Sequence, residues 1–279
     1  MDAPTVERIL VAFLREETEA AGLKRAVLGL SGGIDSAVVV YLAARALGPE
    51  NVTAVMMPTS ISSPKSLEDA HLCVDGTGVQ HRTVDITAMA DAYLDTHAPD
   101  ASALRKGNVF ARCRMIVLYD VSAEVGGLVY GTSNKTELLL GYGTLFGDLA
   151  SAINPIGDLY KTQVRQLAAH LGVPEPVRTK APSADLWEGQ TDEDELGGTY
   201  EQFDHLLYRL VDRREKPERL VEDGFTEEFV RSALHRVRAN QYKRRAPVIA
   251  KLSSRTIGPD FRIPRDAGLS LDRRLPRRP

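Results

Sequence analysis

The sequence predicts an α/β protein in which helices cover both faces of an open, mostly parallel sheet. Two observations predict this class. Short apolar runs typical of strands alternate with helix-like segments through the first half of the chain, and two of the strands lead into helices through glycine-containing turns, at residues 31–36 and 131–134. Since ligands in such sheets bind beyond the carboxyl ends of the strands, we expect both turns at the ligand-binding edge.

The elements of this sheet follow in order. A helix with an apolar stripe is expected first, over residues 6–21. Apolar runs then predict strands at residues 26–30, 52–57, 81–86 and 128–130. The segments between these strands predict helices at residues 37–47, 66–74 and 110–124. Each of these helices can carry the chain from one parallel strand to the next.

Beyond Gly143 the pattern becomes helical and irregular. Helices are expected over residues 158–171, 199–212 and 226–245, and no repeat or low-complexity linker divides the chain. We therefore expect residues 1–250 to form one domain. Residues 251–279 are rich in arginine and proline and are expected to form a tail.

Composition excludes several classes of protein. The 279 residues carry a net charge of −3, which argues against a general nucleic-acid coat, so nucleic-acid binding is not expected even with a basic tail. No apolar run reaches the roughly 18 residues of a membrane span, and the acidic N-terminal segment is unlike a signal peptide. The two cysteines, Cys73 and Cys113, lack metal-like spacing. A reducing cytoplasm is the expected location.

The turn Ser31-Gly32-Gly33-Ile34-Asp35-Ser36 lies between the first strand of the sheet and a helix. Two glycines there allow backbone N–H groups and the positive end of the helix to face one point, which favours phosphate. Ser31 and Ser36 add hydroxyl donors, and Asp35 makes sense beside phosphates if a metal ion lies between them. The alternative is an ordinary strand-to-helix turn with a Ser or Asp cap.

This turn differs from two commoner phosphate-binding motifs. No lysine follows the glycines, and the three-glycine dinucleotide fingerprint is absent. The turn resembles the loop of the ATP pyrophosphatase superfamily, which has a Rossmann-like fold of the adenine nucleotide α-hydrolase type. The resemblance implies that the loop holds the β and γ phosphates of ATP and leaves the α phosphate open to attack.

A second strand-to-helix turn, Gly131-Thr132-Ser133-Asn134, is followed by Glu137. Glu137 is expected one helical turn further on, at the same sheet edge as Asp35. Two carboxylates beside a phosphate site suit a hard divalent cation such as Mg²⁺. Taken alone, Glu137 would more simply complement the helix dipole as an N-terminal acid. Beside Asp35 we favour the metal.

Several later segments resemble successive motifs of the NAD⁺ synthetase family, in that family's order over about residues 25–250. The phosphate loop alone would fit many adenylating ligases and tRNA-thiolating enzymes, so these motifs carry the substrate prediction. They are residues 106–108, 111–115, 131–134 with Glu137, 147–148, 159–165, 180–186 and 190–197.

The resemblance implies a reaction in two steps. The nicotinate carboxylate of deamido-NAD⁺ attacks the α phosphate of ATP and releases pyrophosphate, and ammonia then displaces AMP to give NAD⁺. Positioning and charge stabilisation would supply most of the acceleration.

The same resemblance implies roles for individual residues. Asp35 and Lys180 are implied to be catalytic, and Asp35 and Glu137 to hold Mg²⁺. Deamido-NAD⁺ is implied to contact Arg112, Tyr242 and Lys243. ATP is implied to contact Gly29, Leu30, Ser31, Gly32, Gly33, Ile34, Asp35, Ser36, Thr132, Lys180 and Thr199.

Three positions depart from the pattern of the ammonia-using bacterial enzymes. Leu145 stands where those enzymes have Lys, and Ala152 stands where they have an Asp that contacts deamido-NAD⁺. Tyr242-Lys243 stands in place of a His-Lys pair. These departures leave open how the carboxylate and ribose of deamido-NAD⁺ are held.

Residues 172–198 form a long polar stretch that contains the only tryptophan, Trp187. We expect this stretch to close over ATP as a lid, because an acyl adenylate hydrolyses if it is exposed to water. A flexible acidic loop is the alternative. Since no amidase domain is recognised, free ammonia is the expected nitrogen source, with a separate glutaminase partner left open. The family implies a homodimer.

Two other functions remain as alternatives. One is another adenylating ligase of the superfamily, acting on tRNA or on a different carboxylate or carbonyl; the lack of a basic face and of metal-binding cysteines argues against tRNA thiolation. The other is a non-enzymatic nucleotide sensor. Asp35, Glu137 and Lys180 argue against a sensor, which needs no metal-bound pyrophosphate leaving group. An NAD⁺ synthetase is the predicted function.

Overall fold

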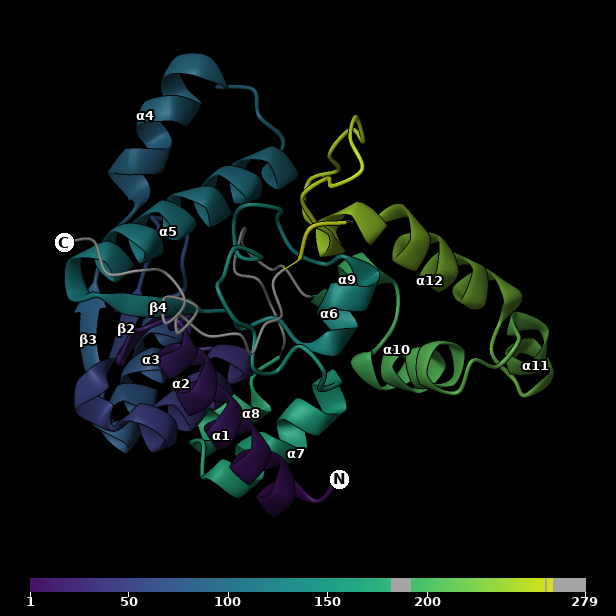
Figure 1. Ribbon diagram of the computed structural model, residues 1–279, viewed down its shortest axis with the longest axis horizontal. Helices are drawn as coiled ribbons and strands as arrows, with labels where there is room; N and C mark the ends of the chain where they lie inside the picture. The colour runs from purple at the N-terminus through teal and green to yellow at the C-terminus, as the bar shows by residue number, and fades with distance from the viewer. Residues whose placement is uncertain (182–191, 259, 263–279) are drawn as a thin grey trace.

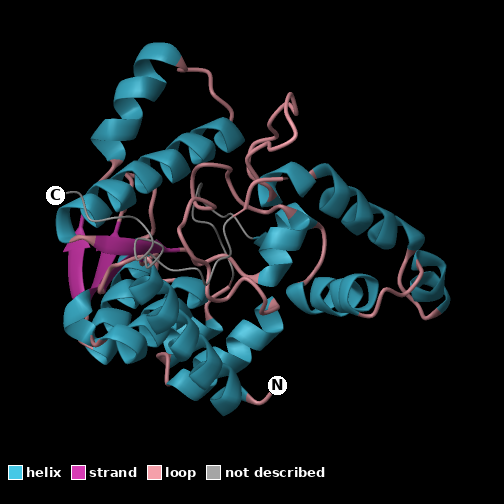
Figure 2. Cartoon of the chain, viewed as in Figure 1, coloured by secondary structure: helices cyan, strands magenta, loops and turns pink. Residues whose placement is uncertain are grey.

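The computed structural model describes residues 1–181, 192–258 and 260–262, and the described chain contains one four-stranded parallel sheet (Figures 1 and 2). Its strand order is β3-β2-β1-β4. The strands are β1 (Arg25–Gly29), β2 (Val52–Met56), β3 (Gln80–Thr83) and β4 (Gly127–Tyr130). The predicted parallel sheet is confirmed. The third strand ends at Thr83, three residues before the predicted end at residue 86.

Helices cover both faces of the sheet, as predicted. Side chains alternate along β1, so that Ala26 and Leu28 join a core on one face while Val27 joins Val55 and Val121 on the other. The first face packs against α1 (Ala3–Ala20), α2 (Ile34–Leu47), α3 (Pro64–Thr77) and α7 (Lys161–Leu171). The second face packs against α5 (Ala103–Val125), beside which lies α4 (Thr87–His97).

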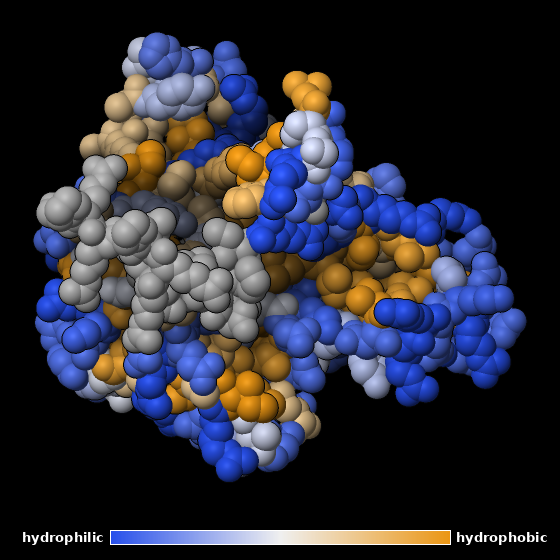
Figure 3. All heavy atoms as spheres, viewed as in Figure 1, coloured by the Kyte–Doolittle hydropathy of each residue, from blue (hydrophilic) through white to orange (hydrophobic). Residues whose placement is uncertain are grey.

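A second hydrophobic cluster lies away from the sheet. Figure 3 shows apolar side chains between α10 and α12, with hydrophilic residues on the outer surfaces of these helices. The cluster includes Tyr200, Phe203 and Leu220. The helices that form it are α6 (Lys135–Leu140), α10 (Tyr200–Leu207), α11 (Pro217–Glu222) and α12 (Glu227–Ala239).

Two predicted C-terminal helices are interrupted. The helix expected over residues 199–212 is α10 followed by a π-helix, Tyr208–Asp212, and the helix expected over 226–245 is α12 followed by a 3₁₀ helix, Gln241–Arg244. The helix expected from residue 158 begins at Lys161. Two short helices, α8 (Glu175–Thr179) and α9 (Asp192–Leu196), flank the undescribed residues 182–191. Among the described helices, none is both long and apolar enough to cross a membrane.

The strand order places the two glycine turns side by side. β1 pairs with β4, with Leu28 opposite Tyr130, so both strands end at the same edge of the sheet. The chain passes from β1 to β2 on one side and reaches β4 on the other side of β1. Such a reversal in strand order opens a crevice between the strand ends, which is where open α/β sheets bind ligands.

Candidate active site

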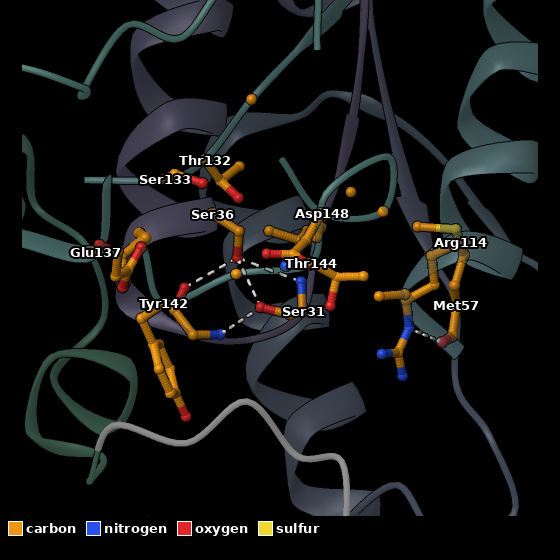
Figure 4. A pocket seen from close by; sticks show the side chains of 18 of the residues that line it. Ser31, Ser36, Met57, Arg114, Thr132, Ser133, Glu137, Tyr142, Thr144 and Asp148 are labelled. Carbon is orange, nitrogen blue, oxygen red and sulfur yellow. Dashed lines mark hydrogen bonds between the residues drawn. The ribbon is translucent and has the colours of Figure 1, made fainter. Parts of the chain in front are cut away.

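A cavity of about 600 Å³ opens at this crevice (Figure 4). Strands β1, β2 and β4 and the loops that follow them contribute to its wall. Most of the predicted site residues line it, although they come from widely separated segments. These residues are Gly29, Leu30, Ser31, Gly33, Ile34, Asp35, Ser36, Thr132, Glu137, Lys180 and Lys243.

The glycine turn is shaped by close packing against α3. Gly32 has a φ of +76°, which disfavours any residue with a side chain. A Cβ atom at this position would lie 2.1 Å from the backbone oxygen of Ser66. Gly33 is the N-cap of α2 and provides no side-chain cap. The first turn of α2 therefore presents backbone N–H groups, which favour an anion.

Two serines brace this turn. The Ser31 and Ser36 Oγ atoms lie 3.1 Å apart, and the Ser36 hydroxyl donates to the Gly33 backbone oxygen at 3.0 Å. The Gly33 backbone N–H in turn donates to Ser31 Oγ at 3.2 Å. Figure 4 shows both hydroxyls at the cavity, with Thr132 of the neighbouring loop close by. The ordinary Ser or Asp cap that the sequence left open is not used at this helix start.

Asp35 and Glu137 converge on the ammonium of Lys161. Lys161 Nζ lies 2.5 Å from Asp35 Oδ2 and 3.4 Å from Glu137 Oε1. The Asn134 amide donates to Asp35 Oδ1 at 3.0 Å, which joins the two turns directly. Glu137 also closes a capping box with Asn134 at the start of α6. The place of Glu137 as an acid at the helix start, which was the alternative, and its predicted place at the site are therefore compatible in one side chain.

Burial sets the charges in this cluster. Burial and the nearby Asp35 carboxylate together raise the pKa of Glu137 to about 8, although the Lys161 ammonium opposes the shift. Burial alone would lower the pKa of Lys161, but the Asp35 and Glu137 carboxylates outweigh it and raise that pKa. Lys161, whose side chain is only 3% exposed, thus stays charged and holds the two carboxyl groups close together.

The pair of carboxylates fits a hard divalent cation. Asp35 and Glu137 aim oxygen atoms at one point beside the phosphate-favouring turn, and Mg²⁺ prefers oxygen ligands. Among the described residues no group of three or more His, Cys, Asp or Glu side chains gathers in a way that could hold a metal ion. Mg²⁺ usually takes one or two protein carboxylates and completes its shell with water and substrate phosphates.

Two further lysines reach the cavity. Lys180 follows α8, and its Nζ donates to Ser66 Oγ at 3.0 Å. Lys243 donates to the backbone oxygens of Gly141 and Gly143, at 2.7 Å each. Burial lowers the pKa of Lys243, against which the Asp148 carboxylate acts. Together with Lys161, these lysines place positive charge on a surface suited to phosphates.

Four predicted residues do not line this cavity. Thr199 caps α10 by accepting a hydrogen bond from Gln202 N, and Tyr242 is 60% exposed. Arg112 is exposed and donates to the Leu145 backbone oxygen at 3.3 Å. Gly32 packs against α3 instead. For these four residues, as for those that line the cavity, a ligand contact remains a prediction. Residues 182–191 of the predicted lid, with Trp187, lie outside the described residues, and closure over ATP stays a prediction.

Lys161 is the functional residue that sequence reasoning did not single out. It appeared only within the motif at residues 159–165, and no spacing linked it to Asp35. One signal was available. Lys161 is the first residue of α7, where a positive charge opposes the helix dipole, so such a lysine requires compensation from nearby acids. Tyr142 and Asp192 also line the cavity, joined by a hydrogen bond of 2.9 Å from the Tyr142 hydroxyl.

The parallel sheet, the uncapped glycine turn and the carboxylate pair define an α/β nucleotide-binding protein of the adenine nucleotide α-hydrolase type. A family model described as NAD synthase matches residues 6–247, and the chain belongs to that family.

Similar proteins agree with this assignment. The NH(3)-dependent NAD(+) synthetase of Trichlorobacter lovleyi is 61% identical over 94% of this chain and 96% of its own length. Two solved structures cover 90% of this chain. The NH3-dependent NAD synthetase from Campylobacter jejuni has a TM-score of 0.77 and 36% identity, with all of its chain covered. The NMN synthetase from Francisella tularensis has a TM-score of 0.80 and 32% identity, with 99% covered.

Proposed function

We propose that this chain is an ammonia-dependent NAD⁺ synthetase, a ligase that forms a C–N bond. ATP adenylates the nicotinate carboxylate of deamido-NAD⁺, and ammonia then gives NAD⁺ and AMP. The family match over residues 6–247 and the 61% identity to the Trichlorobacter lovleyi enzyme support this substrate set. The observation that carries the proposal for the site is the convergence of Asp35 and Glu137 beside the uncapped start of α2.

The ATP half of the site follows from the loop geometry. The backbone N–H groups of residues 34–36 and the Ser31 and Ser36 hydroxyls face the cavity and would grip the pyrophosphate portion of ATP. Lys180 would add positive charge as pyrophosphate leaves. Thr132 contributes a further hydroxyl from the turn after β4. The α phosphate then remains accessible to the substrate carboxylate.

Mg²⁺ would be held by Asp35 and Glu137. When bound, such an ion neutralises charge on the phosphate oxygens and orients them. The Lys161 ammonium, which contacts both carboxylates, would offset part of their negative charge, and it opposes the rise that burial causes in the pKa of Glu137. Because a protonated Glu137 is a poor metal ligand, loss of Lys161 would weaken the metal site.

Deamido-NAD⁺ would occupy the side of the cavity near Lys243, Asp148 and Thr144. Lys243 is well placed for a phosphate or carboxylate of that substrate, while Arg112 and Tyr242 would contact it from outside the described cavity wall. We also propose that the enzyme acts in the cytoplasm as a homodimer and takes free ammonia. A separate glutaminase would be revealed if glutamine supported the reaction only in the presence of a second protein.

The proposal is tested by incubating the purified chain with Mg-ATP, ammonium and deamido-NAD⁺. We expect NAD⁺ and AMP in equal amounts; release of ADP, or no turnover, would contradict the proposed function. The same assay with nicotinate mononucleotide measures NMN synthesis, the activity named for the Francisella tularensis neighbour. A higher kcat/KM for the mononucleotide would reassign the substrate.

Asp35→Asn tests the metal site, because it removes one charge and preserves shape. We expect kcat to fall at least about 100-fold, since charge stabilisation of the leaving pyrophosphate is lost. Asp158→Asn is the matched control, because Asp158 is 96% exposed and pairs only with Lys135 among the described residues. Circular dichroism checks that both variants are folded. Near-normal activity of Asp35→Asn at limiting Mg²⁺ would remove Asp35 from the metal site.

A further inference from the structure

Lys180 contacts a carboxylate to which no motif assigned a role. Its Nζ lies 3.1 Å from Oδ2 of Asp69, on the second turn of α3. The Asp69 side chain is 1% exposed, whereas that of Lys180 is 25% exposed and lines the cavity. A buried carboxylate therefore lies behind a lysine that faces the proposed nucleotide site.

The contact between the Lys180 ammonium and Asp69 Oδ2 is an ion pair without a hydrogen bond. No described residue donates a hydrogen bond to Asp69 Oδ2, so the Lys180 ammonium compensates this atom through charge alone. The second cation near Asp69 is Lys65, whose Nζ lies 3.8 Å from Oδ1 and whose side chain is 63% exposed. Because an unpaired buried carboxylate is strongly unfavourable, Asp69 restricts where the Lys180 ammonium can lie.

Asp69 lies in apolar surroundings. Ala70 and Cys73 on the same helix belong to the main hydrophobic core. Burial raises the pKa of the Cys73 thiol to about 12, and the negative charge of Asp69 contributes to that shift. Water therefore screens Asp69 poorly, and its attraction for Lys180 is stronger than that of a surface pair.

The same helix also supports the phosphate-binding turn. Ser66, which accepts the hydrogen bond from Lys180, is the residue whose backbone oxygen packs against Gly32. The start of α3 thus touches the glycine turn through its backbone and the Lys180 ammonium through its side chains. A lysine fixed to this helix has a defined position relative to any phosphate held by the turn.

We propose that Asp69 is a positioning residue that holds the Lys180 ammonium at the cavity for the phosphates of ATP. Lys180 comes from a segment after α8 that the sheet does not hold, so the ion pair with α3 supplies the missing constraint. Because Lys180 makes no directed hydrogen bond to Oδ2, the N–H groups that it does not use for Ser66 Oγ stay available to phosphate oxygens. This inference rests on the proposed role of Lys180 at ATP.

A double-mutant cycle tests the inference. Asp69→Asn removes the charge with little change of shape, Lys180→Met removes the ammonium, and both are combined. We expect Asp69→Asn to raise the KM for ATP about tenfold, the effect of losing one charged interaction. The KM for deamido-NAD⁺ should change less than twofold. In the Lys180→Met background, Asp69→Asn should have no further effect on the KM for ATP.

Lys65→Met is the matched control, because Lys65 faces the same carboxylate from the solvent side. It should leave the KM for ATP within twofold of wild type. If Asp69→Asn does not fold, Asp69→Leu replaces it, since an apolar side chain of similar volume avoids an unpaired dipole in the core. A change below twofold in the KM for ATP in a folded Asp69 variant, or independent effects of the Asp69 and Lys180 substitutions, would overturn the inference.

Binding of Mg-ATP by titration calorimetry separates this inference from the proposed function. The Kd for Mg-ATP is measured for wild type, the two single variants and the double variant, all without deamido-NAD⁺. The result therefore does not depend on whether the protein makes NAD⁺. Coupling of the two substitutions in Kd supports the positioning role. A loss of stability in Asp69→Asn with an unchanged Kd would show that Asp69 has a purely structural role.

Discussion

At the scale of single residues, the site depends on side chains that satisfy two requirements at once. Glu137 uses Oε2 to cap α6 through the Asn134 backbone N–H and directs Oε1 toward Lys161. Asn134 caps the same helix with its oxygen and holds Asp35 with its amide nitrogen. Each group is fixed by local structure before any ligand binds, which is the condition for electrostatic preorganisation.

Gly32→Ala should destabilise the protein and abolish ATP binding. The added Cβ would lie 2.1 Å from the Ser66 backbone oxygen, and the alanine would also have to adopt a positive φ. We expect a loss of about 3 kcal/mol in the free energy of unfolding from strain and displacement of α3. Urea denaturation measures this loss.

Gly172→Ala is the control for backbone strain. Gly172 has a φ of +80°, and a Cβ there would meet no atom within 4 Å. The expected loss is about 1 kcal/mol, with ATP binding unchanged. Equal losses in the two alanine variants would show that contact with α3 does not determine the shape of the phosphate-binding turn.

At the scale of elements, the start of α2 differs in its capping from the starts of α6 and α10. α6 and α10 begin with side-chain caps from Asn134 and Thr199. α2 begins at Gly33 with no side-chain cap. The backbone donors of α2 are therefore available to an anion, whereas part of the donors at the starts of α6 and α10 is already satisfied.

Thr199→Ala decides between the capping role seen in the structure and the ATP contact predicted from the family. As a cap, Thr199 accepts from Gln202 N at 3.3 Å, and its loss should lower the free energy of unfolding by about 1 kcal/mol with the KM for ATP unchanged. Thr226→Ala removes the equivalent cap of α12, which accepts from Phe229 N at 3.3 Å, and provides the matched control. A rise in the KM for ATP in Thr199→Ala alone would assign the threonine to ATP.

Glu7 joins three helices and makes their packing depend on pH. It contacts Arg45 of α2 and His170 of α7 from its place in α1. Partial burial opposes ionisation of Glu7, but hydrogen bonds from Arg45 and His170 outweigh it and lower its pKa from the usual 4.5. The contribution of Glu7 to stability is therefore complete above pH 4.5 and is lost as the pH falls through the lowered pKa.

Glu7→Gln should accordingly be less stable than wild type by about 1 kcal/mol near neutral pH, with the difference shrinking in acid below the usual glutamate pKa. Denaturation curves at several pH values measure the difference. Glu16→Gln, an exposed position on the same helix, should show no such gap. A gap that is constant across the acidic range would rule out the Glu7 carboxylate as its source.

At the scale of the whole molecule, two hydrophobic clusters meet behind the cavity. One includes the sheet and α1, α2, α3 and α7, and the other lies among α6, α10, α11 and α12. Asp204 of α10 joins them, because its carboxylate accepts from Thr136 Oγ1 at 2.5 Å and from Thr162 N at 2.7 Å. Since α7 begins with Lys161, this junction also fixes one end of the active site.

Asp204→Ala should weaken this junction. The buried Thr136 hydroxyl and the Thr162 backbone N–H would lose their acceptor, and we expect a loss of about 3 kcal/mol in the free energy of unfolding. Because Lys161 then loses its fixed position, kcat should fall as well. Asp158→Ala, at an exposed carboxylate, should remain within about 0.5 kcal/mol of wild type. Unchanged stability in Asp204→Ala would show that other contacts hold the two clusters together.

The parallel sheet and the two turns were predictable from the sequence, because they depend on interactions that are local in the chain. Apolar runs and glycine positions placed β1, β4 and both loops to within a few residues, and parallel pairing brought their ends to one edge. Helix ends were less well predicted. The break after α10 arises where a π-helix follows Leu207, which no periodic pattern reveals.

The sequence by itself determined the fold class, the phosphate-favouring turn and the two carboxylates that converge on one point. Only the tertiary structure decided which charge lies between them and which threonine serves as a cap. Lys161 and Asp69 lie far along the chain from the groups they contact, Asp35 and Lys180. Their roles follow from burial and distance, because the attraction between charges depends on the space and dielectric between them and not on their separation in sequence.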